Sequence, residues 1–159
     1  MAQNKDHIKS TYPLPVYNYQ VTVLKDAETL VIGFAEVSGL SVEYEPVTYK
    51  HGLSFVMGNK FIPGMRQPIR LTMKKGIVKS GDFLQSWIYN TYTDPFFSSA
   101  NRDILIDLCD ESGKPVIRWT VRKALPIKLD APTFDANSND VAIETMEVIA
   151  DYLQVDYDP

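Results

Sequence analysis

The chain has 159 residues, of which 45% are hydrophobic and 23% are charged, and its net charge is −4. This length fits one domain with a substantial core, and the absence of a dense basic patch argues against a nucleic-acid-binding surface. No apolar run reaches membrane-spanning length, so no membrane anchoring is expected. The single cysteine, Cys109, excludes an intrachain disulfide and is expected to be a small buried hydrophobe.

The first part of the chain predicts a tail followed by strands. Residues 1–11 are polar and aperiodic, which predicts a flexible tail before a single domain at 12–159. From Tyr17, alternating apolar positions predict a half-buried strand. Residues 30–34 are apolar on both sides and predict a strand covered on both faces. Residues 40–45 alternate again and predict a further strand.

The segment 46–65 interrupts this pattern. It contains three glycines and two prolines, yet it is rich in apolar and aromatic residues. A long loop of this composition is unusual inside a compact domain. It is therefore either folded back onto its own core, with a short hairpin, or an exposed contact site. The candidate contact residues are Tyr49, Leu53, Phe55, Val56, Met57, Phe61 and Ile62.

A strand and the only convincing helix come next. Residues 69–74 alternate apolar and polar, which predicts a strand with one solvated face. Ser80 is a candidate helix cap, with Asp82 in the first turn. Phe96 and Phe97 are expected to cover the helix end or to pack beneath the sheet. Helical spacing links an apolar stripe of Phe83, Leu84, Trp87, Ile88 and Thr91.

The C-terminal part predicts sheet. Residues 104–108 and 115–123 form a hairpin pattern around a turn at 110–114. Pro126 and Pro132 punctuate the connection that follows, and the polar segment 135–140 predicts a turn held by Asn and Asp side chains. The final run from Val141 is interpreted as strand. Seven or so strands and one helix predict a mainly β domain, an antiparallel sandwich or a partly closed barrel.

No group of residues is arranged for catalysis. His7 and His51 have no partner at zinc-ligand spacing. Glu144 and Glu147 would point to opposite faces of a strand, and Asp107 is explained by a position on a solvated face. We therefore expect no catalytic residues, no cofactor and no metal site.

Several segments resemble the tube-protein family of contractile tails and of phage-like injection systems, with the type VI secretion ring protein as a distant relative. The resembling text is GKPVIRWTVRKALPIK followed by LDAPTFDANSNDVAIETMEV at 113–148. Earlier segments agree, namely YPLPVYNYQVTV, GFAEVSGLSVEYE and IPGMRQPIRLTMKKGI. Each motif alone is weak, but their order and spacing make the resemblance specific over roughly residues 12 to 155.

The resemblance implies a structural subunit with no enzymatic activity. Six copies would form a ring whose sheets merge into one barrel around a channel, and stacked rings would form a tube that protein cargo can traverse. The loop at 46–65 would bridge neighbouring subunits or rings, and the helix would lie on the outer wall. The implied partners are a contractile sheath, a baseplate and a tube cap. Synthesis in the bacterial cytoplasm would precede release or firing of the particle.

Other interpretations remain open on the sequence alone. Within the family, the chain could be a baseplate or tube-initiating paralogue, or a type VI-like ring protein. Outside it, a monomeric module that binds a small ligand or a carbohydrate would need an apolar cavity with convergent polar groups. An enzyme on a β scaffold would need a nucleophile and a base, and the sequence shows no such pair.

Overall fold

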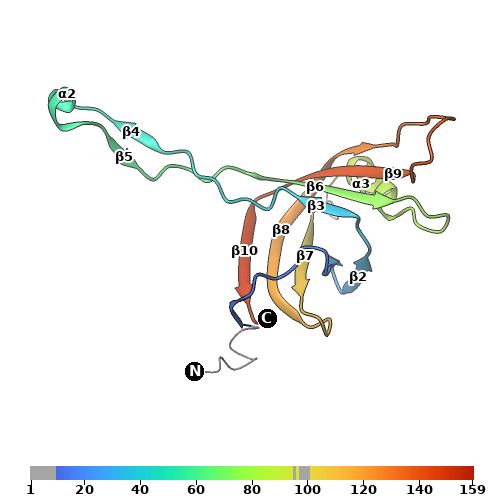
Figure 1. Ribbon diagram of the computed structural model, residues 1–159. Helices are drawn as coiled ribbons and strands as arrows, with labels where there is room; N and C mark the ends of the chain where they lie inside the picture. The colour runs from blue at the N-terminus through green and yellow to red at the C-terminus, as the bar shows by residue number, and fades with distance from the viewer. Residues whose placement is uncertain (1–9, 95, 97–100) are drawn as a thin grey trace, which may run out of the picture.

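The computed structural model describes residues 10–94, 96 and 101–159, and it shows an antiparallel β body from which a narrow arm projects (Figure 1). In the described part of the chain, the body is an eight-stranded sheet and the arm is a separate two-stranded one. The body strands follow the order β2 (Glu28–Ile32), β1 (Tyr19–Lys25), β7 (Arg102–Cys109), β8 (Pro115–Asp130), β9 (Ile143–Ala150), β6 (Ile69–Gly76) and β3 (Glu36–Ser38), with β10 (Tyr152–Tyr157) paired to β8.

The long strand β8 joins two layers of this sheet. Its first part lies between β7 and β10, whereas its last residues pair with β9. β9 and β10 are consecutive in the chain and are separated only at Asp151. Figure 1 shows β7, β8 and β10 crossing the layer that contains β3, β6 and β9. Within the described residues the end strands β2 and β3 do not pair with each other. The subunit is therefore mainly antiparallel β as predicted, but it is not a closed barrel.

The core lies between these layers and helix α3 (Phe83–Thr93). Ile69, Leu71 and Met73 of β6 are each at most 1% exposed, while Arg70 on the opposite face is exposed, which confirms the predicted alternation. The predicted helix is also confirmed. Its buried residues are Leu84, Trp87 and Thr91, which come from the predicted stripe.

The helix starts later than the predicted cap. Asp82 occupies the N-cap position and Phe83 is the first helical residue, so Ser80 is not the cap. At the other end, the Tyr92 hydroxyl donates to the Pro126 carbonyl oxygen at 2.7 Å and ties the helix to β8. Phe96 is 86% exposed and covers nothing. Phe97 lies outside the described residues, as do His7 and residues 1–9 of the predicted tail.

Three strand predictions were wrong in detail. β2 is an edge strand, so Leu30 and Val31 are exposed and the strand is not covered on both faces. Residues 40–45 form no strand and contribute one isolated bridge, Tyr44 to Arg66. Pro126 lies inside β8, where the register with β9 shifts between Pro126 and Lys128. A bulge is one of the few places where a sheet tolerates proline, because its missing N–H is not needed there.

The other C-terminal predictions are confirmed in full or in part. β7 and β8 form the predicted hairpin, and the run after Val141 is strand. The turn at 135–140 is held in part as expected: the Asp135 carboxylate accepts from the Asn137 N–H at 3.0 Å, but the second bond is accepted by the Ser138 hydroxyl, from the Asp140 N–H at 3.1 Å, and not by an Asn side chain.

Candidate functional site

The arm, residues 46–65, is the candidate contact site, and it is a projecting hairpin (Figure 1). β4 (Val47–Tyr49) pairs antiparallel with β5 (Lys60–Ile62). The short helix α2 (Ser54–Met57) lies at the tip. The hairpin considered in the sequence interpretation is therefore present, but it does not fold back onto the core.

The base of the arm is a ladder that continues from the body. The Glu45 N–H donates to the Met65 carbonyl oxygen at 3.0 Å, and the Gln67 N–H donates to the Glu43 carbonyl oxygen at 2.8 Å. The two legs lie close together at Gly64, where any β-carbon would collide with the Glu45 carbonyl oxygen. A residue without a side chain is needed here for the legs to stay paired.

The tip is closed by local hydrogen bonds. The Ser54 hydroxyl accepts from the His51 N–H at 2.7 Å, and His51 Nδ1 accepts from the Leu53 N–H at 3.1 Å. Gly58 ends α2 with φ +79° and donates its N–H to the Ser54 carbonyl oxygen. This left-handed backbone favours glycine. His51 thus has a local structural role beside α2 at the arm tip, whereas Cys109 lies in the body strand β7 (Figure 1).

The arm exposes its apolar side chains. Phe55 is 87% exposed and Phe61 is 72% exposed. All seven residues predicted as contacts are at least 48% exposed. An isolated two-stranded hairpin is marginally stable in water, and a contiguous apolar patch of this kind is typical of an interaction site. The structure thus brings the predicted residues together on one projecting element.

The body has open strand edges that the sequence did not reveal. β10, β8, β7, β1 and β2 follow one another in one layer, so β10 and β2 are its two edges. Leu30 and Val31 on β2, and Val155 and Tyr157 on β10, are exposed. Unpaired strand edges are templates for pairing with another chain. An exposed apolar side chain on an edge strand indicates a contact surface, but the sequence does not say which strands are edges until the strand order is known.

The loop between β8 and β9, residues 131–142, was also missed as a contact candidate. It exposes Phe134 at 87% and Val141 at 75%, and it lines an open hollow of about 680 Å³. The sequence signal for this contact candidate was Phe134, a lone aromatic residue within a polar turn segment.

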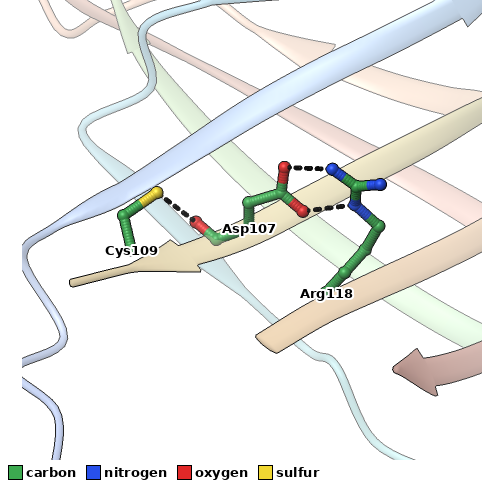
Figure 2. Close-up of polar contacts among 3 residues, drawn as sticks. All are labelled: Asp107, Cys109 and Arg118. Atoms are coloured by element: carbon green, nitrogen blue, oxygen red, sulfur yellow. Dashed lines mark hydrogen bonds and ion pairs between the residues drawn. The ribbon is translucent and has the colours of Figure 1, made fainter. Parts of the chain in front are cut away.

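Among the described ionisable groups of the body, Asp107 and Arg118 form a partly buried structural pair. Asp107 is 5% exposed, so its predicted solvated position was wrong. Figure 2 shows the reason, because the Arg118 guanidinium donates to both carboxylate oxygens, at 2.6 and 2.8 Å. This hydrogen bonding raises the pKa of Arg118. Cys109 is buried, as predicted, and burial raises the pKa of its thiol, which disfavours a nucleophilic thiolate.

The described residues also offer few groups that could bind a metal ion or a small ligand. Among the described residues, no group of three or more His, Cys, Asp or Glu side chains lies close enough to hold a metal ion. Lys75 Nζ lies 4.0 Å from Glu144, which is therefore a partly buried ion-pair member. An apolar hollow of about 590 Å³ lies beside β1 and β3, but its single charged lining residue, Glu36, is already paired with Lys74. No helix in the described part of the chain is long and apolar enough to cross a bilayer.

Comparison with known families decides what kind of protein this is. Residues 15–154 match the family described as T4-like virus tail tube protein gp19. The chain belongs to this family. It is a structural tail tube protein, of the kind found in contractile injection systems.

Solved structures agree with this membership over nearly the whole tail tube protein. A chain of the PVC sheath-tube complex, an extracellular contractile injection system in its extended state, is 30% identical with a TM-score of 0.85, covering 98% of this chain and 99% of that one. A chain of the anti-feeding prophage tube terminating cap is 30% identical with a TM-score of 0.81 and 99% coverage of both chains. A chain of the PVC sheath/tube terminator is 32% identical with a TM-score of 0.79, covering 91% and 97%.

More distant likenesses show the fold alone. A chain in the virion of a gene transfer agent is 12% identical with a TM-score of 0.58, covering 98% of this chain and 99% of that one. An Hcp protein is 9% identical with a TM-score of 0.52, covering 87% and 98%. No curated protein sequence matches the tail tube protein.

Proposed function

We propose that this tail tube protein is the main inner-tube subunit of a contractile tail or extracellular injection particle. Six copies form a ring, the rings stack into a hollow tube, and the arm bridges neighbouring subunits or rings. The observation that carries this proposal is the end-to-end likeness to the PVC tube chain together with the projecting apolar arm.

Ring closure through the open edges would give the tube its stiffness. β2 and β10 terminate the same layer on opposite sides, so the β10 edge of one copy can pair with the β2 edge of the next. Such strand addition uses main-chain hydrogen bonds, and a rotation that closes gives a ring. The exposed Val31 and Val155 would be covered by the same contact. This arrangement would complete around the channel the barrel that one subunit leaves open.

The partners follow from the same likeness. The PVC chain comes from a sheath-tube complex, and other similar chains come from a cap, a terminator and a baseplate. We therefore propose a contractile sheath, a baseplate and a tube cap as partners, with α3 on the outer wall. The tube carries cargo mechanically and catalyses no reaction. The chain is made in the bacterial cytoplasm and acts in an extracellular particle.

The main-tube role is favoured over an initiating role at the baseplate. The similar chain in the anti-feeding prophage baseplate is 23% identical, which shows the fold alone, whereas the sheath-tube chain is 30% identical. The tube-initiating paralogue is the second candidate. It would form single rings that do not elongate by themselves.

Negative-stain electron microscopy of the concentrated protein tests the proposal. The main tube subunit is expected to give rings and tubes with a central hole. Light scattering during size-exclusion chromatography should show a species six times the 18.0 kDa chain. A monomer of 18.0 kDa at all concentrations and ionic strengths would contradict ring formation, and single rings without tubes would favour the initiating paralogue.

A further inference from the structure

The arm and the β8–β9 loop lie at opposite ends of one layer of the body (Figure 1). The second leg of the arm enters β6, whose first residue, Ile69, pairs with Ala150. At the far end of β6, Gly76 pairs with Ile143, the first residue after the β8–β9 loop. The eight residues of β6 separate these two ends by roughly 24 Å at about 3.4 Å per residue.

The two ends carry opposite charges. The basic residues of the arm are Lys50, His51 and Lys60, and the arm contains no Asp or Glu. Residues 131–142 contain Asp135 and Asp140 and no basic residue. The arm is thus a basic segment and the β8–β9 loop an acidic one. Complementary charges of this kind select a partner and an orientation.

The two ends also match in shape and polarity. The arm tip projects from the body (Figure 1) and exposes the apolar side chains of Phe55 at 87% and Met57 at 70%. The β8–β9 loop lines the open hollow of about 680 Å³, whose lining includes Phe134 and Val141 as well as the two aspartates. The side chains of Phe134 and Val141 are both exposed, so neither is buried by its own subunit.

We propose that the arm tip of one copy docks into the β8–β9 loop of a second copy in the next ring, with Lys50 and Lys60 facing Asp135 and Asp140. This inference rests on the proposed tube function and names the surface that receives the arm. The contact joins two different patches and does not close on itself, so it propagates as a stack. It also gives the stack a direction, because every arm points the same way.

Two other docking modes are less consistent with the structure. Contact between two arm tips would bring Lys50 and Lys60 of both copies together, and like charges repel. Asp156 and the exposed Tyr157 form another region that is acidic and apolar, but it lies on the β10 edge, which is positioned for lateral pairing within a ring.

A reciprocal charge swap tests the electrostatic part of this contact. Lys50→Glu/Lys60→Glu and Asp135→Lys/Asp140→Lys are each expected to lose long tubes at low ionic strength, where charge contacts are least screened. A stoichiometric mixture of the two variants, or one chain that carries all four changes, should recover them. The matched control is Asp94→Lys/Glu111→Lys, which makes the same charge change at acidic residues outside the arm, the β8–β9 loop and the edge strands β2 and β10, and it should leave tubes intact.

A disulfide test places the two surfaces side by side. In a Cys109→Ser background, Val56→Cys/Phe134→Cys should give a ladder of covalent oligomers after mild oxidation of assembled tubes. Val56→Cys alone and Phe134→Cys alone should remain monomeric on a non-reducing gel. A ladder that stops at dimer from Val56→Cys alone would show tip-to-tip contact and overturn the proposal.

The outcomes separate this inference from the proposed function. If the wild-type chain forms neither rings nor tubes, the proposed function fails and the inference fails with it. If the wild-type chain forms tubes, but Asp135→Lys/Asp140→Lys elongates normally or the charge swap restores nothing, the tube function stands and the receiving surface is wrong.

Discussion

Asp107 on β7 and Arg118 on β8 are direct partners in the strand register. The Arg118 guanidinium donates two hydrogen bonds to the buried Asp107 carboxylate, at 2.6 and 2.8 Å. The carboxylate side chain is 6% exposed and the guanidinium side chain is 32% exposed. The two partners are therefore unequally buried. Removing the Arg118 side chain would leave the charged Asp107 carboxylate with little access to water.

Arg118→Ala is expected to destabilise the subunit strongly. Removing one partner of a buried ion pair typically costs about 3–5 kcal/mol of unfolding free energy. Asp107→Val/Arg118→Val should be less destabilised than Arg118→Ala, because the double variant leaves no buried charge. Urea unfolding of the dissociated subunit measures both values. A loss below about 0.5 kcal/mol for Arg118→Ala, the range typical of surface substitutions, would contradict the structural role.

Gly64→Ala should change the direction in which the arm projects, without unfolding the body. A β-carbon at Gly64 would collide with the Glu45 carbonyl oxygen, so the two legs must separate at the base. We expect tubes to be lost while the urea midpoint of the body stays unchanged. The matched control is Gly52→Ala, since a β-carbon there meets nothing within 4 Å. Loss of tubes in both variants, or in neither, would argue against the close approach at Gly64.

Deleting residues 50–60 is expected to leave a folded subunit that forms no long tubes. The finer version is Phe55→Ser, which changes a side chain that is 87% exposed. Its effect on unfolding free energy should stay within about 0.5 kcal/mol, as for other surface substitutions. Electron microscopy checks tube length, and Tyr89→Ser on the exposed face of α3 is the control that should still form tubes. Normal tubes from the deletion would rule out the arm as the bridging element.

Cys109 should react slowly with iodoacetamide in the folded subunit. Burial raises the pKa of its thiol, and the charges of Asp107 and Asp110 raise it further. A thiol whose pKa is raised by folding contributes stability below its unfolded pKa of about 8.5, and that contribution is lost as the pH rises toward the folded value. Labelling followed by mass spectrometry at pH 8, with and without urea, checks the accessibility. Labelling of the folded protein at the rate of the urea-unfolded protein would contradict it.

The sequence correctly predicted those elements whose buried face can be recognised from the spacing of their own apolar residues. The alternation at Ile69, Leu71 and Met73 and the helical stripe around Trp87 each identify a buried face without knowledge of any partner. The same reasoning failed for Leu30 and Val31, because their exposure depends on β2 being the last strand of the sheet.

The site was partly predictable for the same reason. The apolar composition of residues 46–65 indicated a contact surface, but only the three-dimensional structure distinguishes a projecting arm from a loop folded onto the core. Asp107 was assigned to a solvated face because its partner, Arg118, lies on another strand. The acidic hollow around Phe134 has only a weak local signal, a lone aromatic residue in a polar segment, because its meaning depends on the basic arm at the other end of the layer.

The arm grows from neighbouring strands, since its two legs join β3 and β6, which pair with each other. The length of the arm can therefore set the axial spacing between neighbouring copies in a tube. Adding two residues to each leg would keep every side chain on its present face and lengthen the reach by about 6.8 Å, whereas adding one would turn the apolar side chains over. Tubes of different axial spacing could thus be built from one unchanged body, with lengths selected in steps of a residue pair.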